Sequence, residues 1–407
     1  MNKITKRTKD ILFGLVSALF FSTFIYLSDF GLENKLLNTF LGLVAIGSVL
    51  YIPKRSVLVA GFTIGILWFY WIGYSFEYQG VGFMTPIVTL GFGVLYLLLF
   101  LPMYFTTNPF IRAALLFGLS FLEPFDWNWF KPELLFIDSF IGVYKYQFGF
   151  VLLALASTLY AYKHYPKYKY YPLVLLVFAI NFGYPPQKNI PLSIKLVQTD
   201  VKQEDKWQQK NLYPTVEMIF KEITQAKYEG YEVVVLPESV FPLFMNKSPK
   251  LLSELKKISY DITIIAGALL VEEGKHYNVT YMFKEGEYQV AKKIVLVPFG
   301  EYIPLPSFMK EFVNDTFFQG ASDFVTAEQP TDFTINKTKI RNAICYEATC
   351  DALYQGEFDF MVAISNNAWF APSIEPTLQR LLMKYYARKY GVTIYHSANY
   401  KGSGVIK

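Results

Sequence analysis

The sequence predicts an N-terminal α-helical membrane bundle of about seven transmembrane helices, followed by an α/β domain built as a layered sandwich. Of the 407 residues, 53% are hydrophobic and only 17% are charged, whereas an ordinary globular chain has about 25% charged residues. Long apolar runs fill the chain up to Gly183, and short β-type runs alternate with helical ones after Pro185. We therefore expect a membrane bundle at 1–184 and an α/β domain at 185–407.

Charge and residue counts exclude several classes of function. The net charge of +5 comes without a basic stripe interleaved with aromatics, so we expect no nucleic acid partner. Two cysteines cannot build a disulfide framework, and three histidines leave little for a metal site. We expect neither a metal nor a cofactor.

Seven apolar runs are candidates for membrane helices, which need about 17–25 mostly apolar residues. They lie at 11–27, 36–52, 56–76, 84–105, 111–122, 146–162 and 170–182, and the fifth and seventh are short. No small-residue cleavage site follows the first run, which favours an uncleaved signal anchor. Four tryptophans lie near run ends or in an outer loop, where we expect interfacial aromatics without a catalytic role: Trp68, Trp71, Trp127 and Trp129.

The loop charges predict the orientation, because Lys and Arg prefer the cytoplasmic side. The basic loops alternate with loops that are mainly acidic. The basic loops contain Lys3, Lys6, Arg7, Lys9, Lys54, Arg55, Arg112, Lys163, Lys167 and Lys169. The basic residues of the other loops are Lys35, Lys131 and Lys145. This pattern places the N-terminus in the cytoplasm and, after seven crossings, the α/β domain outside.

The second half reads as strands with a few helices. A helix is predicted at 215–230, because Val216, Ile219, Phe220 and Ile223 share one face, and another at 376–390. No Gly-rich phosphate loop follows a strand, so a layered sandwich fits better than a doubly wound fold. The predicted strands are 193–201, 232–236, 262–269, 277–283, 288–296, a strand into 344–345, 359–365 and 392–397.

Three polar residues lie at or near the ends of these strands. Glu238 follows EVVVL, Lys293 occurs in AKKIVLVPFGEYIP, and Cys345 ends a strand in RNAICYEAT. A thiol with a pKa of about 8.5 needs a base or a nearby cation to act as a nucleophile at neutral pH. With no suitable His, Glu238 can take the thiol proton and Lys293 can stabilise an oxyanion. Taken singly, each residue also fits a structural role, as a buried thiol or a solvated charge.

The words around these residues point to a known family. LVPFGEYIPLP at 296–306, ICYE at 344–347 and SNNAWF at 365–370 occur in this order. Together with the apolar N-terminal runs, these words resemble the apolipoprotein N-acyltransferase family of the carbon–nitrogen hydrolase (nitrilase) superfamily. The resemblance covers nearly the whole chain. The resemblance implies a nitrilase-like αββα sandwich. It also implies that Glu238 is the general base, Lys293 the oxyanion-stabilising cation and Cys345 the acyl-accepting nucleophile.

The resemblance implies supporting or substrate-binding residues as well. Glu301, in FGEY, resembles the family's second essential carboxylate, and the pair after Cys345 matches its Tyr-Glu pair. For Glu347 and Trp369 a structural role is an equal alternative to substrate contact, and for Trp207 we favour packing. The full set is Glu301, Tyr346, Glu347, Trp369, Asn278 and Trp207.

The family reaction implies a location and partners. An acyl chain passes from a phospholipid to Cys345 as a thioester, and then to the α-amino group of the N-terminal diacylglyceryl-cysteine of an apolipoprotein. Two steps are needed because a thioester reacts readily with an amine and an ester does not. We expect a multi-pass monomer of the bacterial inner membrane, with a periplasmic catalytic domain and with a phospholipid donor, a diacylated apolipoprotein acceptor and the lipid bilayer as partners. The alternatives are a membrane-tethered amidase with the same triad, or an inactive module that binds lipid or lipoprotein.

Several departures and open alternatives accompany the resemblance. Asn367 and Ala371 replace the family's usual Asp and Gly, and the chain ends at Lys407, where fuller members continue with more sheet and a last membrane helix; this indicates a shortened branch or a truncated sequence. Cys350 reads as a structural thiol. Apolar side chains near Glu238 and Glu301 would dip into lipid or pack a small core: Phe241, Leu243, Phe244, Met245, Ile303, Leu305, Phe308, Met309, Phe317 and Phe318.

Overall fold

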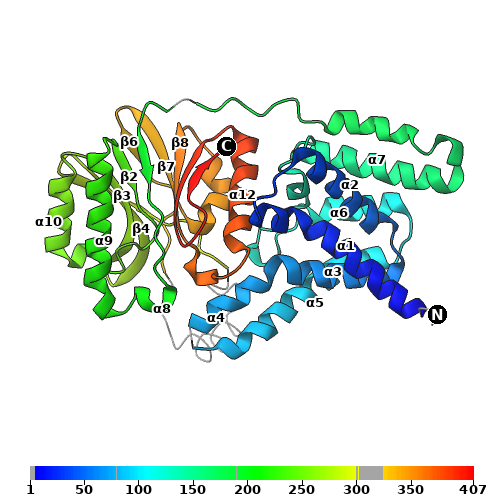
Figure 1. Ribbon diagram of the computed structural model, residues 1–407, viewed down its shortest axis with the longest axis horizontal. Helices are drawn as coiled ribbons and strands as arrows, with labels where there is room; N and C mark the ends of the chain where they lie inside the picture. Colours follow the sequence, from blue (N-terminus) through cyan, green and yellow to red (C-terminus); the bar gives the residue numbers. More distant parts are fainter. Residues whose placement is uncertain (1–4, 79, 189, 299–300, 302–323) are drawn as a thin grey trace. The chain divides into compact units, whose positions relative to one another are not determined.

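The chain divides into two compact units, Met1–Tyr184 and Pro185–Lys407. The computed structural model describes residues 5–78, 80–188, 190–298, 301 and 324–407. Figure 1 shows helices in the first unit, and two sheets with flanking helices in the second.

Six of the α-helices described in the first unit coincide with the first six predicted runs. They are α1 (Lys6–Asp29), α2 (Lys35–Tyr51), α3 (Lys54–Phe69), α5 (Thr85–Tyr104), α6 (Pro109–Leu119) and α7 (Lys145–His164). Short turns between them are η1 (Tyr70–Tyr74), α4 (Ser75–Tyr78), η2 (Gly82–Met84), η3 (Pro124–Asp126), η4 (Pro132–Phe136) and η5 (Pro166–Tyr168). Within the part of the chain that the structure describes, three stretches are long and apolar enough to cross a membrane, namely Lys6–Asp29, Lys54–Tyr78 and Gly82–Tyr104, while α2 and α6 are shorter apolar helices.

The seventh predicted run is not an α-helix. It forms the 3₁₀-helix η6 (Tyr171–Ala179) of 9 residues. At about 2 Å per residue, such a helix is about 18 Å long, which is shorter than the hydrocarbon core of about 30 Å. Beyond it, Ile180 is extended and its neighbours pair with the 140–142 backbone, through Gly142 N–H to Ala179 O and Asn181 N–H to Phe140 O.

Glycines allow α3 and α5 to approach closely. A Cβ atom at Gly65 would lie 2.4 Å from the Phe92 carbonyl oxygen, and one at Gly61 would lie 2.8 Å from that of Tyr96. Gly61 and Gly65 are four residues apart, so they lie on one face of α3, a spacing typical of tightly packed membrane helices. The backbones of the two helices are therefore in direct contact along this face.

The four tryptophans are buried inside the first unit. Trp68, Trp71, Trp127 and Trp129 are each at most 5% exposed. They pack against one another and against Phe69, with Trp71 and Trp129 ring centroids 5.2 Å apart. Their large aromatic faces gain from mutual packing, so these four side chains belong to the core of the first unit.

Arg112 is likewise not a solvated loop charge. Its side chain is fully buried, and Nη1 donates to the Ile52 carbonyl oxygen at 2.6 Å and to that of Leu50 at 3.3 Å. These oxygens lie at the C-terminal end of α2, where carbonyl groups have no partners within the helix and attract cations. Arg112 therefore caps α2 inside the unit.

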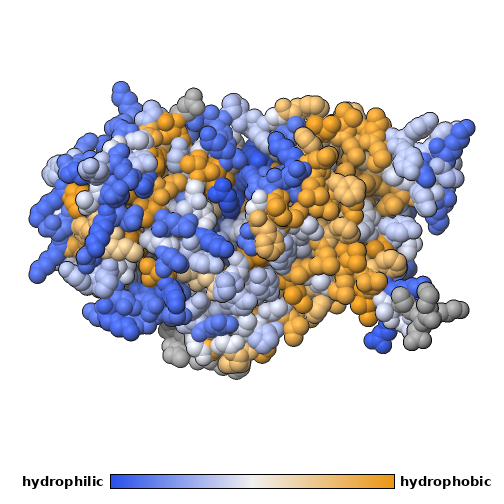
Figure 2. Space-filling view, in the orientation of Figure 1, coloured by the Kyte–Doolittle hydropathy of each residue, from blue (hydrophilic) through white to orange (hydrophobic). Residues whose placement is uncertain are grey.

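The outer surface of the first unit is apolar. Figure 2 shows hydrophobic side chains gathered over it. On α5, Ile87, Leu90, Val94 and Leu98 are all about half exposed, at a spacing that keeps them on one helix face. Large contiguous apolar surfaces of this kind mark contact with lipid or protein, which agrees with a membrane bundle.

The second unit contains two five-stranded sheets. The first has the order β1 (Ile194–Leu196), β2 (Val233–Val235), β3 (Thr263–Glu272), β4 (Lys275–Lys284), β5 (Glu287–Lys292). The second has the order β10 (Gly404–Ile406), β9 (Ile394–Asn399), β8 (Phe360–Asn366), β7 (Thr338–Ile344), β6 (Asp332–Ile335). β1, β2 and β3 are parallel, as are β7, β8 and β9, and the remaining pairs are antiparallel.

Alternating side chains define the layers. Val233 and Val235 face the second sheet in a core with Ile344 and Val362, whereas Val234 faces the helices. This is the period of two that a strand buried on both faces requires. Helices α9 (Gln209–Tyr228) and α10 (Pro249–Ile258) cover the first sheet, and α12 (Glu375–Tyr390) covers the second (Figure 1). The αββα sandwich is therefore confirmed.

Among the described residues of the second unit, the predicted elements occur with shifted ends, and further elements appear beside them. The short elements α8 (Gln203–Lys206), α10, β6 and β10 were not predicted. Helix α9 begins six residues before the predicted start, because it continues through Pro214. From the sequence, a proline is expected to break a helix, since it lacks the N–H donor. The predicted turn at 284–286 is a two-residue hairpin in which Glu285 and Gly286 have φ of 52° and 80°.

A pair of substitutions tests the α3–α5 contact. We expect Gly65→Ala to destabilise the first unit by about 1–3 kcal/mol, because the added methyl group meets backbone. Gly91→Ala in α5 is the control, since nothing lies within 4 Å of its Cβ position. Thermal unfolding in detergent measures both. Equal melting temperatures would show that the helices are not in close contact at Gly65.

Candidate active site

The two sheets bring Glu238, Lys293 and Cys345 together. Glu238 follows β2 and Lys293 follows β5 in the first sheet, and Cys345 follows β7 in the second. Glu238 and Lys293 are the acid and the cation whose charges act most strongly on the Cys345 thiol. Three residues that are distant in sequence therefore share one electrostatic environment.

A strained turn presents Cys345. The strand β7 ends at Ile344, and Cys345 begins the 3₁₀-helix η8 (Cys345–Thr349) with φ of 56°. A non-glycine residue at positive φ costs about 1–3 kcal/mol and persists where the surrounding structure enforces it. The sharp turn leaves the thiol half-buried at the end of the sheet.

Glu238 sits in a similar turn that depends on a glycine. Ser239, directly after it, has φ of 46°. On the neighbouring strand β3, a Cβ atom at Gly267 would lie 2.4 Å from Ser239 N and 2.7 Å from Glu238 Cα. Gly267 is therefore required for the Glu238 turn to lie against the sheet.

Both carboxylate oxygens of Glu238 are held. Oε1 accepts from Asn278 Nδ2 at 2.8 Å, and Oε2 accepts from the backbone N–H of Asn366 at 2.8 Å. Asn366 ends β8 in the second sheet, so Glu238 links the two sheets. Glu238 is 7% exposed, and the two hydrogen bonds leave its carboxylate little freedom to rotate.

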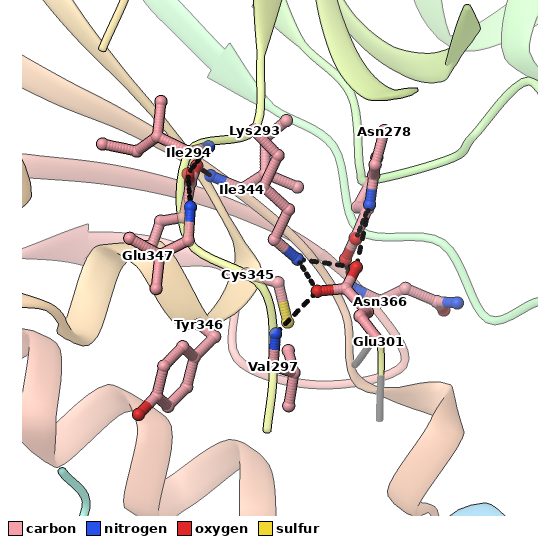
Figure 3. Close-up of polar contacts among 12 residues, drawn as sticks. Asn278, Lys293, Ile294, Val297, Glu301, Ile344, Cys345, Tyr346, Glu347 and Asn366 are labelled. Carbon is pink, nitrogen blue, oxygen red and sulfur yellow. Dashed lines mark hydrogen bonds and ion pairs between the residues drawn. The ribbon is translucent and has the colours of Figure 1, made fainter. Parts of the chain in front are cut away.

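Lys293 forms a buried ion pair with Glu301. Its Nζ lies 2.8 Å from Glu301 Oε1 and 2.7 Å from Oε2, and the lysine is 1% exposed. Glu301 Oε2 also accepts from Val297 N–H at 2.8 Å, and Asn278 Nδ2 lies 3.4 Å from Oε1. Asn278 thereby bridges the two carboxylates. Figure 3 shows the side chains of Lys293, Glu301 and Cys345 pointing toward one another.

The charges keep the lysine protonated and disfavour the thiolate. Burial alone lowers the pKa of Lys293, but Glu301, with Glu238 and Cys345, outweighs it and raises that pKa above its ordinary value. Burial, followed by Glu238, raises the pKa of the Cys345 thiol, and Lys293 opposes this rise. The resting site therefore holds a neutral thiol beside a fixed cation and a carboxylate that can accept its proton.

Glu347 ties the site together instead of facing a substrate. It is 1% exposed, and its Oε1 accepts from Ile294 and Val295 N–H at 2.5 and 3.0 Å, while Oε2 accepts from Ile344 N–H at 2.7 Å. Burial raises its pKa to about 7, against the opposing charge of Lys293. Of the two alternatives, these contacts favour the structural one.

The other predicted residues lie outside this cluster. The Tyr346 ring is buried and points away from the Cys345 sulfur (Figure 3). Trp369 is partly buried in η10 (Asn367–Phe370), directly after β8. Trp207 is 45% exposed at the end of α8, and its packing role stays a prediction.

Four further residues belong to the site and were not predicted. Lys206 is buried beside Trp207 and donates from Nζ to the Glu238 carbonyl oxygen at 3.0 Å; burial lowers its pKa to about 8, while Glu238 and Cys345 raise it. Asn366 contacts Glu238, and both Gln379 and Glu375 on α12 act on Cys345. Of the four, only Asn366 lies in a word that the sequence singled out, SNNAWF, while Lys206 directly precedes Trp207. The approach of α12 to the Cys345 sulfur depends on the tertiary fold, so no local sequence pattern indicates it.

The apolar residues after Glu238 pack inside the domain. Phe241 and Met245 are fully buried in the core under α9 and α10, and Leu243 packs against it. For these residues the core alternative is right and the lipid alternative is wrong. Phe244 is partly buried against His276. The residues of the second group, Ile303, Leu305, Phe308, Met309, Phe317 and Phe318, lie outside the described residues.

Across the described ranges, no group of three or more His, Cys, Asp or Glu can hold a metal ion. Cys345 and Cys350 are not joined in a disulfide, and Cys350 is buried and donates to the Tyr346 carbonyl oxygen at 3.4 Å. His396 is fully buried, between Gly402 O and Ser365 Oγ, and burial lowers its pKa to about 4.

Comparison with known proteins identifies the family. Residues 8–182 match the model of the apolipoprotein N-acyltransferase integral membrane domain. Apolipoprotein N-acyltransferase of Wolinella succinogenes is 43% identical over 98% of this chain and 96% of its own length. That of Campylobacter jejuni is 36% identical over 98% of this chain and 91% of its own length. A CN-hydrolase superfamily protein of known structure from Xanthomonas campestris is 13% identical, with a TM-score of 0.39 over 51% of this chain and 76% of that chain.

The similarity to these relatives extends over both units and nearly their full lengths. It includes the apolar helices of the first unit, which match the family's membrane domain, and the second unit that carries Glu238, Lys293 and Cys345. The chain therefore belongs to the apolipoprotein N-acyltransferase family.

Proposed function

We propose that this protein transfers an acyl chain from a phospholipid, through a thioester on Cys345, to the α-amino group of the N-terminal diacylglyceryl-cysteine of an apolipoprotein. The observation that supports it is the convergence of a strained cysteine, an oriented carboxylate and a buried lysine in a member of a family whose relatives are named for this activity. Glu238 is the proposed base, Lys293 the oxyanion-stabilising cation and Cys345 the nucleophile.

In the first step, Glu238 takes the thiol proton and the sulfur attacks the ester carbonyl carbon of the phospholipid. The C–S bond forms, and the negative charge on the carbonyl oxygen is stabilised by Lys293. The ester C–O bond then breaks, and Glu238 returns its proton to the departing alkoxide of the lysophospholipid. Cys345 is left as a thioester, and Glu238 is again a carboxylate.

In the second step, the free α-amino group of the acceptor attacks the thioester. Glu238 takes the amine proton as the C–N bond forms, and the C–S bond breaks to release the amide. The sulfur leaves as a thiolate and recovers the proton from Glu238. Glu301 keeps Lys293 charged in both steps, and Asn278 and Glu347 hold the groups in place.

A membrane-tethered amidase is the second candidate function, because the same triad can pass the acyl group to water. The apolar first unit, which matches the family's membrane domain, favours substrates in the bilayer. An inactive binding module would not need a fully buried lysine held by an acid beside an accessible thiol.

We also propose a topology for this reaction. The N-terminus lies in the cytoplasm and the chain crosses the inner membrane seven times, which places the second unit in the periplasm. The last crossing would consist of η6 and the residues that flank it. The backbone bonds of Ile180 and its neighbours to 140–142 support this segment, because the loop charges place 140–142 on the outer side, where the crossing would end.

Acyl-enzyme trapping tests the function. Purified protein incubated with phospholipid carrying a labelled acyl chain should gain a hydroxylamine-sensitive label on Cys345, and a diacylated peptide should remove it as an amide. Cys345→Ala should abolish the label, whereas Cys350→Ser should keep it, because Cys350 is buried away from the triad. Rapid loss of label to water would favour the amidase, and the absence of any adduct would favour the binding module.

The ion pair predicts a pH dependence. Glu301→Gln removes the strongest charge that raises the pKa of Lys293, so burial prevails and this pKa falls. The rate of acyl-enzyme formation should therefore decline at a lower pH than in the wild type, by at least about one unit. Glu272→Gln, which removes the partner of Lys292 in an exposed pair, is the control and should leave the pH profile unchanged. Identical alkaline limbs in all three proteins would contradict the assigned role of Glu301.

Reporter fusions test the topology. Alkaline phosphatase, which is active only outside the cytoplasm, should be active when fused after Lys407 and inactive when fused in the basic loop between α2 and α3. Both fusions are made on the full-length chain, with fluorescent-protein fusions at the same sites as the reciprocal measurement. An inactive phosphatase after Lys407 would require an even number of crossings.

A further inference from the structure

Gln379 contacts the sulfur of Cys345, and the mechanism above does not use it. It lies on α12, is fully buried, and its Nε2 donates to Cys345 Sγ at 3.6 Å. An N–H group that points at sulfur stabilises the anion more than the neutral thiol, because hydrogen bonds to charged acceptors are about twice as strong.

The orientation of this amide is set by Asn367. A glutamine can present either its NH₂ group or its carbonyl oxygen to a neighbour. Asn367, also fully buried, donates from Nδ2 to the Lys401 carbonyl oxygen at 2.8 Å and to Gln379 Oε1 at 3.2 Å. A backbone carbonyl can only accept, so the NH₂ group of Asn367 must face Lys401. Its second N–H then requires the oxygen of Gln379, which leaves the NH₂ group of Gln379 for the sulfur.

The sulfur carries negative charge twice in the reaction, when it attacks the ester and when it leaves the thioester. A donor aimed at it lowers the barrier of both steps. The titratable groups that act on the sulfur are Glu238, Lys293, Glu375, Glu301 and Lys206. Glu238, Glu375 and Glu301 are acids that disfavour the thiolate, and Lys293 favours it. A neutral N–H donor therefore assists Lys293, and it does not titrate itself.

We propose that Asn367 and Gln379 form an amide relay that directs an N–H group at the Cys345 sulfur and stabilises its thiolate. Gln379 touches the reacting atom, and Asn367 is a positioning residue. The proposal rests on Cys345 as the nucleophile of the proposed function. It also gives position 367 a chemical reason to be an amide, because a carboxylate there cannot donate to Lys401 or Gln379. It would instead accept from Gln379 Nε2 and turn the carbonyl oxygen toward the sulfur.

The test measures thiolate formation without acyl transfer. In a Cys350→Ser background, the rate of alkylation of Cys345 by iodoacetamide is followed against pH, with mass spectrometry to locate the label. Gln379→Met keeps the side-chain length and removes the donor, and Asn367→Asp reverses the relay. Each should lower the alkylation rate at neutral pH by about tenfold and move its midpoint up by about one pH unit.

Leu378→Met is the matched control, because it alters the neighbouring buried residue on α12 and leaves the relay intact. It should keep the wild-type midpoint. A wild-type midpoint in Gln379→Met overturns the proposal, and a shift in Gln379→Met alone, with folded Asn367→Asp unchanged, overturns the positioning role of Asn367. Should Asn367→Asp fail to fold, the Gln379→Met result decides.

Acyl-enzyme trapping on the same proteins separates this proposal from the proposed function. A shifted midpoint together with no acyl label on the wild type leaves the relay in place and rejects the transferase. Normal acyl labelling of the wild type with no shift in Gln379→Met rejects the relay and leaves the transferase in place.

Discussion

The catalytic end of the second unit is organised around the buried ammonium group of Lys293. Lys293 is 1% exposed and can stay charged there only because Glu301 pairs with it through both oxygens, since an unpaired charge in a protein interior is costly. That pairing in turn needs Val297 N–H and Asn278 to hold the carboxylate. The lysine, the two nearby carboxylates and the thiol therefore form one coupled set of charges, in which each group alters the protonation of the others.

Hydrogen bonds across the sandwich maintain this geometry. Glu238 extends from the first sheet to the backbone of Asn366 in the second, and Glu347 extends from the second sheet to Ile294 and Val295 after the first. The inter-sheet core is apolar and resists separation, but it does not fix the position of individual side chains. The two glutamates supply that precision at the end of the sheets where Cys345 turns. Buried carboxylates that accept backbone N–H groups thus have a structural function beside any chemical one.

The first unit uses its apolar residues in two ways. Part of them packs inward, as the tryptophans do against one another and as Tyr96 and Phe100 do against the glycines of α3. The rest, such as Ile87 and Leu98 on α5, remains exposed on the outer surface. In water such an exposed apolar surface would be unfavourable, whereas in a bilayer it has no such cost. Because lipid removes the hydrophobic driving force between helices, van der Waals packing at small residues becomes the main interaction that holds them together.

By itself, the sequence determined the two-unit division, six of the membrane-unit helices, most strands of the sandwich, and the strand ends that carry Glu238, Lys293 and Cys345. These follow from local hydrophobic periodicity and from words adjacent in the chain. Only the tertiary structure decided that Glu347 holds backbone, that the tryptophans are buried, that Trp207 is exposed, and that Lys206 and Gln379 reach the site. Such contacts depend on how distant segments approach one another. Gln379 lies 34 residues from Cys345, and no local pattern along α12 indicates which of its side chains will meet a sulfur atom on another element.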